Sequence, residues 1–172
     1  MRRVLAAFGL LFLGSLSAMG CTSGSGCSEG DLCECSQGDQ CYLDCDGDRC
    51  NQSCHNMNRC GTVCGDECTS RVHDVKQGSQ SCGSGCGLEC FSTESCGLLC
   101  GDNCRFNCHD TKQCSAVVGP NSEVTCQSVG ACQVECTGSC IVHCLDQHCQ
   151  ISCAGGADAM MCEPGRYACG GC

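Results

Sequence analysis

Short runs of alternating inward and outward residues recur along the chain, each between two cysteines four positions apart. If the unit Cys-x-x-x-Cys is a strand, both cysteines and the middle residue share one face, and the other two residues share the opposite face. The middle residues are mostly apolar and their neighbours mostly polar. Apolar middle residues are Leu43, Leu98, Phe106, Ala116, Val134, Val142 and Ile151, and polar ones are Gln52, Thr62, Ser70 and Ser84. The pattern predicts short strands with one buried face.

Nine units carry both cysteines, and these eighteen cysteines are the predicted disulfide-forming residues. They are Cys41, Cys45, Cys50, Cys54, Cys60, Cys64, Cys82, Cys86, Cys96, Cys100, Cys104, Cys108, Cys132, Cys136, Cys140, Cys144, Cys149 and Cys153. An apolar or small residue replaces the second cysteine in three degenerate units, Cys68–Val72, Cys114–Val118 and Cys126–Gly130. Gly, Asp and Asn separate the units, as in Gly101-Asp102-Asn103, which is the composition of tight turns.

Geometry limits how the cysteines can pair. Two cysteines four apart in a strand are separated by about 13 Å, whereas a disulfide needs Cα atoms about 4.4–6.8 Å apart. An extended unit therefore cannot bridge its own cysteines, and we expect bridges between stacked strands. First cysteines recur about every 18 residues if two units form one coil, as from Cys50 to Cys68 and from Cys96 to Cys114. The sequence predicts a mainly β protein, a disulfide-stapled β-solenoid with short coils and an interior column of cysteines.

Two alternatives fit the same spacing. Cys-x-x-x-Cys also places two thiols on one face of a helix, as in disulfide-stapled helical hairpins, although the connections are short and the 24 glycines disfavour helices. A string of small disulfide-rich modules is the other alternative. Its linkers would be the irregular inserts Ser70–Ser81 and Ser115–Thr125, which in the solenoid we expect to be loops that leave the stack.

The N-terminus has the layout of an export signal. Arg2 and Arg3 precede an apolar stretch from Val4 to Leu16, and small residues surround Met19. This stretch is too short for a membrane span, so residues 1–20 are predicted to be a signal peptide.

The next residue, Cys21, gives this segment a resemblance to the lipobox of bacterial lipoproteins, in which the cysteine after the cleavage point is lipidated. Gly20 fits that motif, whereas Met19 and Ala18 depart from it, and a small-x-small rule would also allow ordinary cleavage. The resemblance implies lipidation of Cys21. The Gly and Ser residues that follow predict a flexible tether over 21–32, and the cysteine units predict a repeat domain over 33–172. Of the 29 cysteines, 28 then remain for 14 disulfides.

Composition and charge narrow the function classes. Removal of Arg2 and Arg3 leaves seven Lys/Arg against 19 Asp/Glu, a net charge of −12. Such a surface argues against nucleic acid as a partner and favours solubility. Aromatic residues make up 3% of the chain, so disulfides have to replace much of a conventional core. Abundant cysteine behind an export signal indicates an oxidising compartment.

Metal binding is the first alternative function to consider. Metallothioneins are rich in Cys-x-Cys, whereas this chain has one such pair, Cys33/Cys35. The terminal Cys169-Gly-Gly-Cys172 has redox-dithiol spacing, but no thioredoxin-like βαβ pattern precedes it, so we expect a closing disulfide. Asp44, Asp46 and Asp48 alternate around Gly47 and are the candidate calcium ligands, without the order of an EF-hand loop. No other cofactor is predicted.

No enzyme is predicted. The five histidines (His55, His73, His109, His143 and His148) match no metal or triad motif, and the chain lacks a nucleophile elbow or a phosphate loop. Haem attachment requires Cys-x-x-Cys-His, and Cys50-x-x-x-Cys54-His55 has one residue more between its cysteines. The Cys-x-x-x-Cys repeat accounts for this spacing.

Leader, Cys21 and repeat together resemble the cysteine-rich repeat lipoproteins of Gram-negative envelopes. The resemblance implies a non-enzymatic extracytoplasmic module with a structural or adhesive role, held on the membrane by N-terminal lipid (palmitate among its chains). Thr22, in place of the Asp that retains enteric lipoproteins at the inner membrane, implies the outer membrane or cell surface. The alternatives are a metal-binding envelope protein, through thiolates or calcium, and a secreted protein. The sequence identifies no protein or surface partner.

Overall fold

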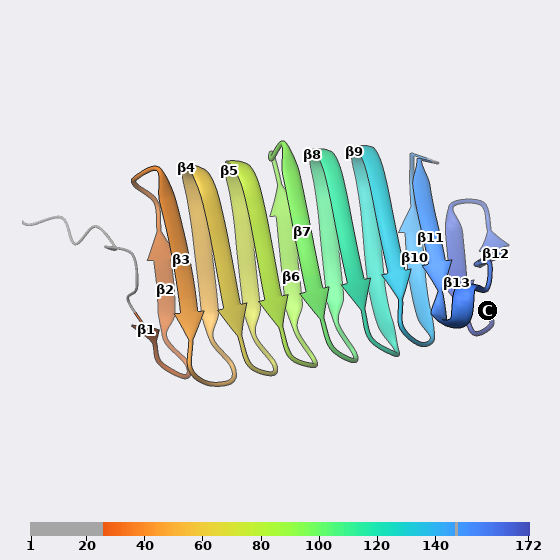
Figure 1. The fold of residues 1–172 in the computed structure, drawn as a ribbon, viewed down its shortest axis with the longest axis horizontal. Helices are drawn as coiled ribbons and strands as arrows, with labels where there is room; N and C mark the ends of the chain where they lie inside the picture. Colours follow the sequence, from red (N-terminus) through yellow and green to blue (C-terminus); the bar gives the residue numbers. More distant parts are fainter. Residues whose placement is uncertain (1–25, 147) are drawn as a thin grey trace, which may run out of the picture.

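The chain folds into a β-solenoid whose coils stack along one axis, with the N-terminal strands at one end and the C-terminal hairpin at the other (Figure 1). In this computed structural model, residues 26–146 and 148–172 are described. The strands are β1 (Gly26–Cys27), β2 (Leu32–Cys35), β3 (Gln40–Cys45), β4 (Asn51–Cys64), β5 (Thr69–Cys82), β6 (Gly87–Phe91), β7 (Ser95–Cys100), β8 (Arg105–Val118), β9 (Ser122–Cys136), β10 (Cys140–Cys144), β11 (Cys149–Cys153), β12 (Met160–Glu163) and β13 (Arg166–Cys169). A single 3₁₀ turn, Ala154–Gly156, is the helical element of these residues. The prediction of a mainly β, disulfide-stapled solenoid is confirmed, and the helical alternative is wrong.

Each coil has two β faces. Face A contains β2, residues 51–55 of β4, 69–73 of β5, β6, 105–109 of β8, 123–127 of β9, and β10. Face B contains β3, the later halves of β4, β5, β8 and β9, together with β7 and β11. Neighbouring coils pair in parallel, and Asn51 pairs with Thr69 just as Arg105 pairs with Glu123. The repeat is therefore 18 residues in the central coils, as the cysteine spacing predicts, whereas it is 19 from β3 to β4 and 17 from β9 to β11.

Two corners connect the faces, and each places one residue in the left-handed region. Corner 1 turns from face A to face B within a coil, at Asn56, Asp74, Ser92, Asp110 and Ser128. Corner 2 leads to the next coil through Arg49, Glu67, Gly85, Asn103 and Asn121. Asn and Asp tolerate positive φ better than most side chains, and glycine does so without cost. The polar residues between the cysteine units thus turn the chain at regular intervals.

Disulfides close both corners. At corner 1 they are Cys35–Cys41, Cys54–Cys60, Cys90–Cys96, Cys108–Cys114, Cys126–Cys132 and Cys144–Cys149. At corner 2 they are Cys45–Cys50, Cys64–Cys68, Cys82–Cys86, Cys100–Cys104 and Cys136–Cys140. The expectation of bridges between stacked strands is wrong. The second cysteine of one unit reaches the first cysteine of the next around the bend, with Cα atoms 6.0–6.6 Å apart at both corners.

Two units were misassigned because Cys-x-x-x-Cys spacing occurs in corners as well as in strands. Cys82 and Cys86 flank corner 2 and bridge each other, so Ser84 lies in the bend, and the strand unit there runs from Cys86 to Cys90. Gly130 does not face inward as predicted, because it is exposed beyond corner 1. The unit in that coil runs instead from Ser122 to Cys126, both of which are buried.

The predicted loops at Ser70–Ser81 and Ser115–Thr125 are also absent from the described residues. Ser70–Ser81 lies within β5, and Ser115–Thr125 runs from β8 through the corner 2 turn at 119–121 into β9, with the strands in register with their neighbours. Val72 and Gly78 occupy the positions of a corner 1 disulfide, and Val118 and Ser122 occupy those of a corner 2 disulfide. The expectation was wrong because it located the repeat by its cysteines, and other residues replace the cysteine pair at these two corners.

The core is a narrow seam between the two disulfide columns. Leu43, Leu98, Phe106, Val134 and Val142 are buried there as predicted. The polar residues Gln52, Thr62, Ser70 and Gln80 are buried too. The alternation of inward and outward side chains therefore continues where the inward residue is polar. Each glutamine side chain donates to backbone carbonyls, for example Gln52 Nε2 to Val63 O at 2.8 Å. The Nε2 atoms of Gln52 and Gln80 are satisfied in this way, whereas their buried Oε1 atoms have no hydrogen-bond partner.

The C-terminus reverses the strand direction. β13 pairs antiparallel with β10, and β12 pairs antiparallel with β13. Cys153–Cys169 and Cys162–Cys172 attach this hairpin. At the other end, β1 pairs with β3 and Cys27 bridges Cys33, so the paired chain begins earlier than residue 33.

Candidate functional site: disulfide columns, corner carboxylates and a ring ladder

All eighteen cysteines of the complete predicted units lie in disulfides. Every one of the 28 cysteines in the described residues is paired, in 14 bridges. Cys21, the predicted lipidation site, lies outside the described residues. Cys169 and Cys172 do not bridge each other, contrary to the expected closing disulfide, because each pairs with a residue upstream, Cys153 and Cys162.

The disulfides of successive coils come close to one another. Sulfur atoms of Cys82, Cys86 and Cys100 lie within 4.8 Å of one another, and three similar groups occur in the described residues. Soft metals such as Zn²⁺ and Cu(I) bind thiolates in groups of this size. All of these sulfurs are in disulfides, however, and a disulfide sulfur carries no thiolate charge. In the oxidised protein these cysteines belong to the hydrophobic core or pack against it.

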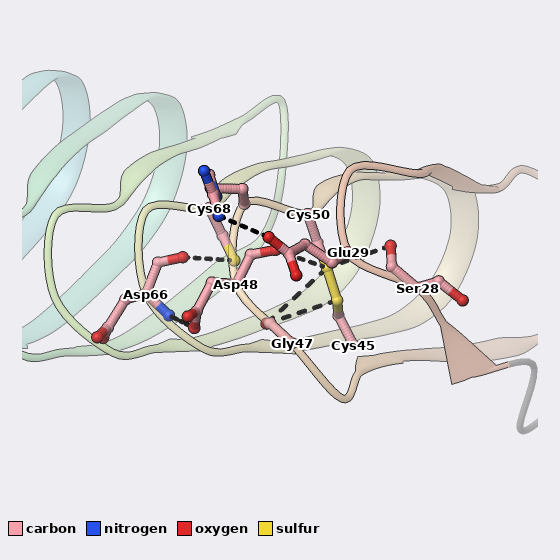
Figure 2. Close-up of polar contacts among 9 residues, drawn as sticks. Ser28, Glu29, Cys45, Gly47, Asp48, Cys50, Asp66 and Cys68 are labelled. Atoms are coloured by element: carbon pink, nitrogen blue, oxygen red, sulfur yellow. Dashed lines mark hydrogen bonds and ion pairs between the residues drawn. A yellow bond between two sulfur atoms is a disulfide. The ribbon is translucent and has the colours of Figure 1, made fainter.

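Of the three predicted calcium ligands, Asp48 lies in corner 2 beside Asp66 of the next coil (Figure 2). Asp44 is exposed on face B and Asp46 is exposed in the bend. Asp48 Oδ1 accepts the backbone N–H of Asp66 at 2.8 Å. The three carboxylates are not among the groups whose ligand atoms gather within 4.8 Å in the described residues, so they do not form a calcium site there.

Asp48 begins a ladder that continues along corner 2. Asp66 Oδ1 accepts the N–H of Ser84 at 2.6 Å, and Ser84 Oγ accepts the N–H of Asp102 at 3.3 Å. Each side chain thus satisfies a backbone donor in the following coil. Glycine is required beside it, since a Cβ at Gly83 would collide with the Asp66 carboxylate. The acidic turns of the sequence are therefore structural caps between coils.

Face A is hollowed into a broad groove of about 960 Å³ that runs across several coils. Charged side chains along it form ion pairs between coils. Arg71 Nε lies 2.7 Å from Glu89 Oε2, and Arg105 Nε lies 3.8 Å from Glu123 Oε2. The groove is polar, with opposite charges alternating along the stack, and offers many hydrogen-bonding groups without a deep enclosed cavity.

A ladder of stacked rings borders this groove at corner 1. His55, His73, Phe91 and His109 occupy the same position in four successive coils. Ring centroids are 4.7–4.9 Å apart and the planes diverge by 3–6°. The sequence analysis found no motif in the histidines. The available signal was their spacing, since positions 55, 73, 91 and 109 are each 18 apart, the length of one coil.

Polar partners hold the imidazoles at both ring nitrogens. His73 Nδ1 lies 2.8 Å from Asp74 Oδ2, and His109 Nδ1 lies 2.9 Å from Asp110 Oδ2. His55 Nε2 lies 3.0 Å from Glu34 Oε1. Because an ionised carboxylate can only accept, the Nδ1 atoms of His73 and His109 carry the proton.

In the described residues, no helix is long and apolar enough to cross a membrane. Comparisons with protein-family models, with curated proteins and with solved structures found no match to this chain. Fold and bridges define its class as a disulfide-stapled β-solenoid. Its disulfide content is that of a protein located outside the cytoplasm.

Proposed function

We propose that the protein is a lipid-anchored, non-enzymatic module of the bacterial cell surface with a structural or adhesive role. One observation carries this proposal: the 28 described cysteines pair completely, which leaves Cys21 as the odd cysteine of 29. In an oxidising compartment a surplus thiol is a liability, and lipidation would remove it. Thr22 supports sorting to the outer membrane. Secretion after ordinary cleavage is the alternative.

The shape supports a structural or adhesive role. A β-stack closed by a disulfide at nearly every corner resists local opening and proteolysis, because each bridge restricts the unfolded chain. Its two long faces present repeating side chains rather than one pocket. Face B offers small residues in register, Ser79, Gly97 and Ser115, and face A offers the ion-paired groove. Repetitive surfaces of this kind favour extended partners over small substrates.

Metal storage through thiolates or calcium is the weaker alternative. The described cysteines are disulfide-bonded, and the corner aspartates bind backbone amides of the next coil. Disulfide sulfurs carry no thiolate charge, and Asp44, Asp46 and Asp48 are not among the groups of ligand atoms that gather in the described residues.

The anchor is tested by intact mass spectrometry of protein extracted from its native envelope. The proposal predicts an N-terminal peptide that begins at Cys21 with the mass of attached acyl chains, and it predicts that C21S is released from the membrane. An unacylated mature chain recovered from the medium would contradict it. Digestion of the soluble C21S protein with a broad-specificity protease tests the rigid module separately, and the solenoid from Gly26 to Cys172 should survive.

A further inference from the structure

We propose that the last two bridges of corner 1, Cys126–Cys132 and Cys144–Cys149, form a thiol–disulfide exchange site that an external dithiol can enter. The site goes beyond the proposed structural role, because it gives the stack a reaction to perform. Its substrate class is a protein or small-molecule dithiol. Its product is a bridge that connects two coils instead of closing a corner. Both bridges lie at the C-terminal end of the column, in β9, β10 and β11.

Three of the four sulfurs gather at one point. The Sγ atoms of Cys126, Cys132 and Cys149 lie within 4.8 Å of one another. Exchange proceeds by direct attack of a thiolate on a disulfide sulfur, so the two bridges can meet without a large movement of the chain. The preceding bridge, Cys108–Cys114, belongs to no such group in the described residues. The site therefore comprises the last two bridges of corner 1.

Strand register brings the same four cysteines together in pairs. Cys132 of β9 is paired with Cys149 of β11, and Cys126 of β9 is paired with Cys144 of β10. Neighbouring strands lie about 4.8 Å apart, and a disulfide needs Cα atoms about 4.4–6.8 Å apart. Each cysteine thus has two partners at bridging distance, one around the corner and one in the adjacent coil. The alternative bridges are Cys132–Cys149 and Cys126–Cys144.

Solvent reaches the site at Cys149. Cys126, Cys132 and Cys144 are each 2% exposed, whereas Cys149 is only partly buried. The other three groups of gathered sulfurs in the described part of the chain consist of buried cysteines. Exchange requires access of the attacking thiolate to a disulfide sulfur, so an incoming dithiol meets its target at Cys149.

The reaction balances as three successive attacks. First, one thiolate of the dithiol attacks Cys149, the Cys144–Cys149 bond breaks, and the electron pair goes to Cys144. The second thiolate of the dithiol then attacks the dithiol sulfur of this mixed disulfide, which oxidises the dithiol to a disulfide and releases Cys149 as a thiolate. Cys149 finally attacks Cys132, so that the Cys132–Cys149 bond forms and the electron pair goes to Cys126.

The net result is the loss of one bridge and the gain of two thiols, on Cys126 and Cys144, each of which takes up a proton. These two cysteines are paired in register, so the thiols remain at bridging distance. An oxidised partner can therefore take the two electrons back and close the Cys126–Cys144 bridge between the coils.

A double substitution tests the geometry of the site without any reductant. In oxidised C21S protein, C126S/C144S removes one cysteine from each bridge and leaves Cys132 and Cys149. The proposal predicts that these two cysteines bond to each other. Alkylation followed by intact mass measurement should then show no free thiol, with the remaining 26 of 28 cysteines in 13 bridges. Two alkylated thiols in this variant would overturn the proposal.

The matched control, C54S/C90S, also removes one cysteine from each of two bridges. It leaves Cys60 and Cys96, and the register places Gly78 between them. Two coil spacings amount to about 9.6 Å, which is too far for a disulfide, so this variant should retain two thiols. Loss of both thiols in the control would contradict the requirement for cysteines in adjacent coils.

A single substitution tests exchange itself. C144S leaves Cys149 as a thiol, and after incubation at pH 8 and an acid quench, peptide mapping should find alkyl label on Cys126 together with a Cys132–Cys149 bridge. C172S is the control, since its thiol at Cys162 belongs to no gathered group in the described residues and should stay where it is. Label confined to Cys149 in C144S would overturn the proposal.

Limited reduction of the C21S protein by a dithiol needs no substitution within the stack, so it does not depend on the folding of a variant. Partly reduced molecules, trapped by alkylation at low pH, should include the Cys132–Cys149 bridge. Corner bridges alone at every extent of reduction would show that the two bridges do not exchange.

Discussion

Corner 1 occurs with and without a disulfide, and its backbone takes the same path in both forms. In coil 68–85, Val72 and Gly78 stand between the bridges Cys54–Cys60 and Cys90–Cys96. The strands continue in register through this coil, and Asp74 keeps the left-handed conformation with φ of 53°. A coil without the disulfide therefore turns at the same place as its neighbours.

Complementary volumes explain how this corner is filled. A Cβ added at Gly78 would lie 2.8 Å from Val72 Cγ1 and 3.5 Å from the sulfurs of Cys90 and Cys96. The Val72 side chain thus takes up the space of a disulfide, and glycine leaves room for it. Corner 2 has its own unbridged form, in which Ser122 Oγ accepts the N–H of Cys104 at 3.0 Å.

Bridged and unbridged corners show that the path of the chain and its stability have different origins. Left-handed residues, corner caps and parallel pairing set the path of the chain in both forms of corner. The disulfides act mainly on the unfolded chain, whose freedom they restrict. We expect the loss of one bridge to leave the coil geometry unchanged and to lower only the free energy of unfolding.

Reduction of all bridges has the largest expected effect. Each bridge closes a loop of only four to six residues in the corner columns, which corresponds to roughly 2 kcal/mol per bridge by loop entropy, although bridges do not add linearly. With few apolar residues to form a core, the reduced chain should lose its β signal in far-ultraviolet circular dichroism at 25 °C. A reduced chain that keeps this signal would show that the strands are stable without the disulfides.

Transfer of the unbridged corner to another coil should cost much less. The double variant C108V/C114G reproduces Val72 and Gly78 in coil 104–121, and it should lower the free energy of unfolding by about 2 kcal/mol. Chemical denaturation measures the loss. C108A/C114A is the matched control and should lose more, since two alanines leave a cavity where valine fills the space.

The reverse substitution should stabilise the protein. V72C/G78C places a pair of cysteines at aligned positions, and the new bridge should raise the free energy of unfolding by about 2 kcal/mol. Mass spectrometry would check that the pair is oxidised. Failure of this pair to oxidise, with two thiols remaining, would mean that the unbridged corner has a different geometry from its neighbours.

Removal of one corner cap is expected to have a smaller effect. Asp66→Ala leaves the N–H of Ser84 without its side-chain acceptor and should cost about 1 kcal/mol, as for other backbone-capping side chains. Asp46→Ala, which alters an exposed carboxylate in the same column, is the control and should change the stability little. Equal losses in the two variants would argue against the cap ladder.

The smallest expected effect is a dependence on pH. Hydrogen bonds from the side chains of Asn58 and Gln40 lower the pKa of Asp39 below its usual 3.8. The unfolded chain therefore binds this proton more readily, and the contribution to stability is present above pH 3.8 and lost as the pH falls through the lower, folded pKa. Denaturation midpoints at pH 5 and pH 2.5 should differ less in D39N than in the parent chain.

Much of the architecture could be predicted from the spacing of cysteines and the period-two pattern. The fold class, the 18-residue repeat of the central coils, most buried middle residues and the turn composition follow from local rules. Pairing could not be deduced, because Cys-x-x-x-Cys spacing occurs both in the strands of the two faces and in the bend of corner 2. Cys82 and Cys86 illustrate this ambiguity, which only the register of neighbouring coils resolves.

The ring ladder was missed for a related reason. A motif search reads residues close together in sequence, whereas a solenoid brings together residues one coil apart. His55 and His73 lie side by side only because of the 18-residue period. Once the repeat length is known, columns of equal position show which polar side chains meet, although not which way their nitrogens point.

Disulfide mapping of the unreduced protein tests the central claim most directly. Digestion within the strands, followed by mass spectrometry with and without reduction, identifies each bridged pair. The fold described here predicts bridges around corners, between cysteines four to six residues apart, such as Cys54–Cys60 and Cys64–Cys68. Bridges between cysteines one coil apart, such as Cys50–Cys68, or several free thiols would contradict it.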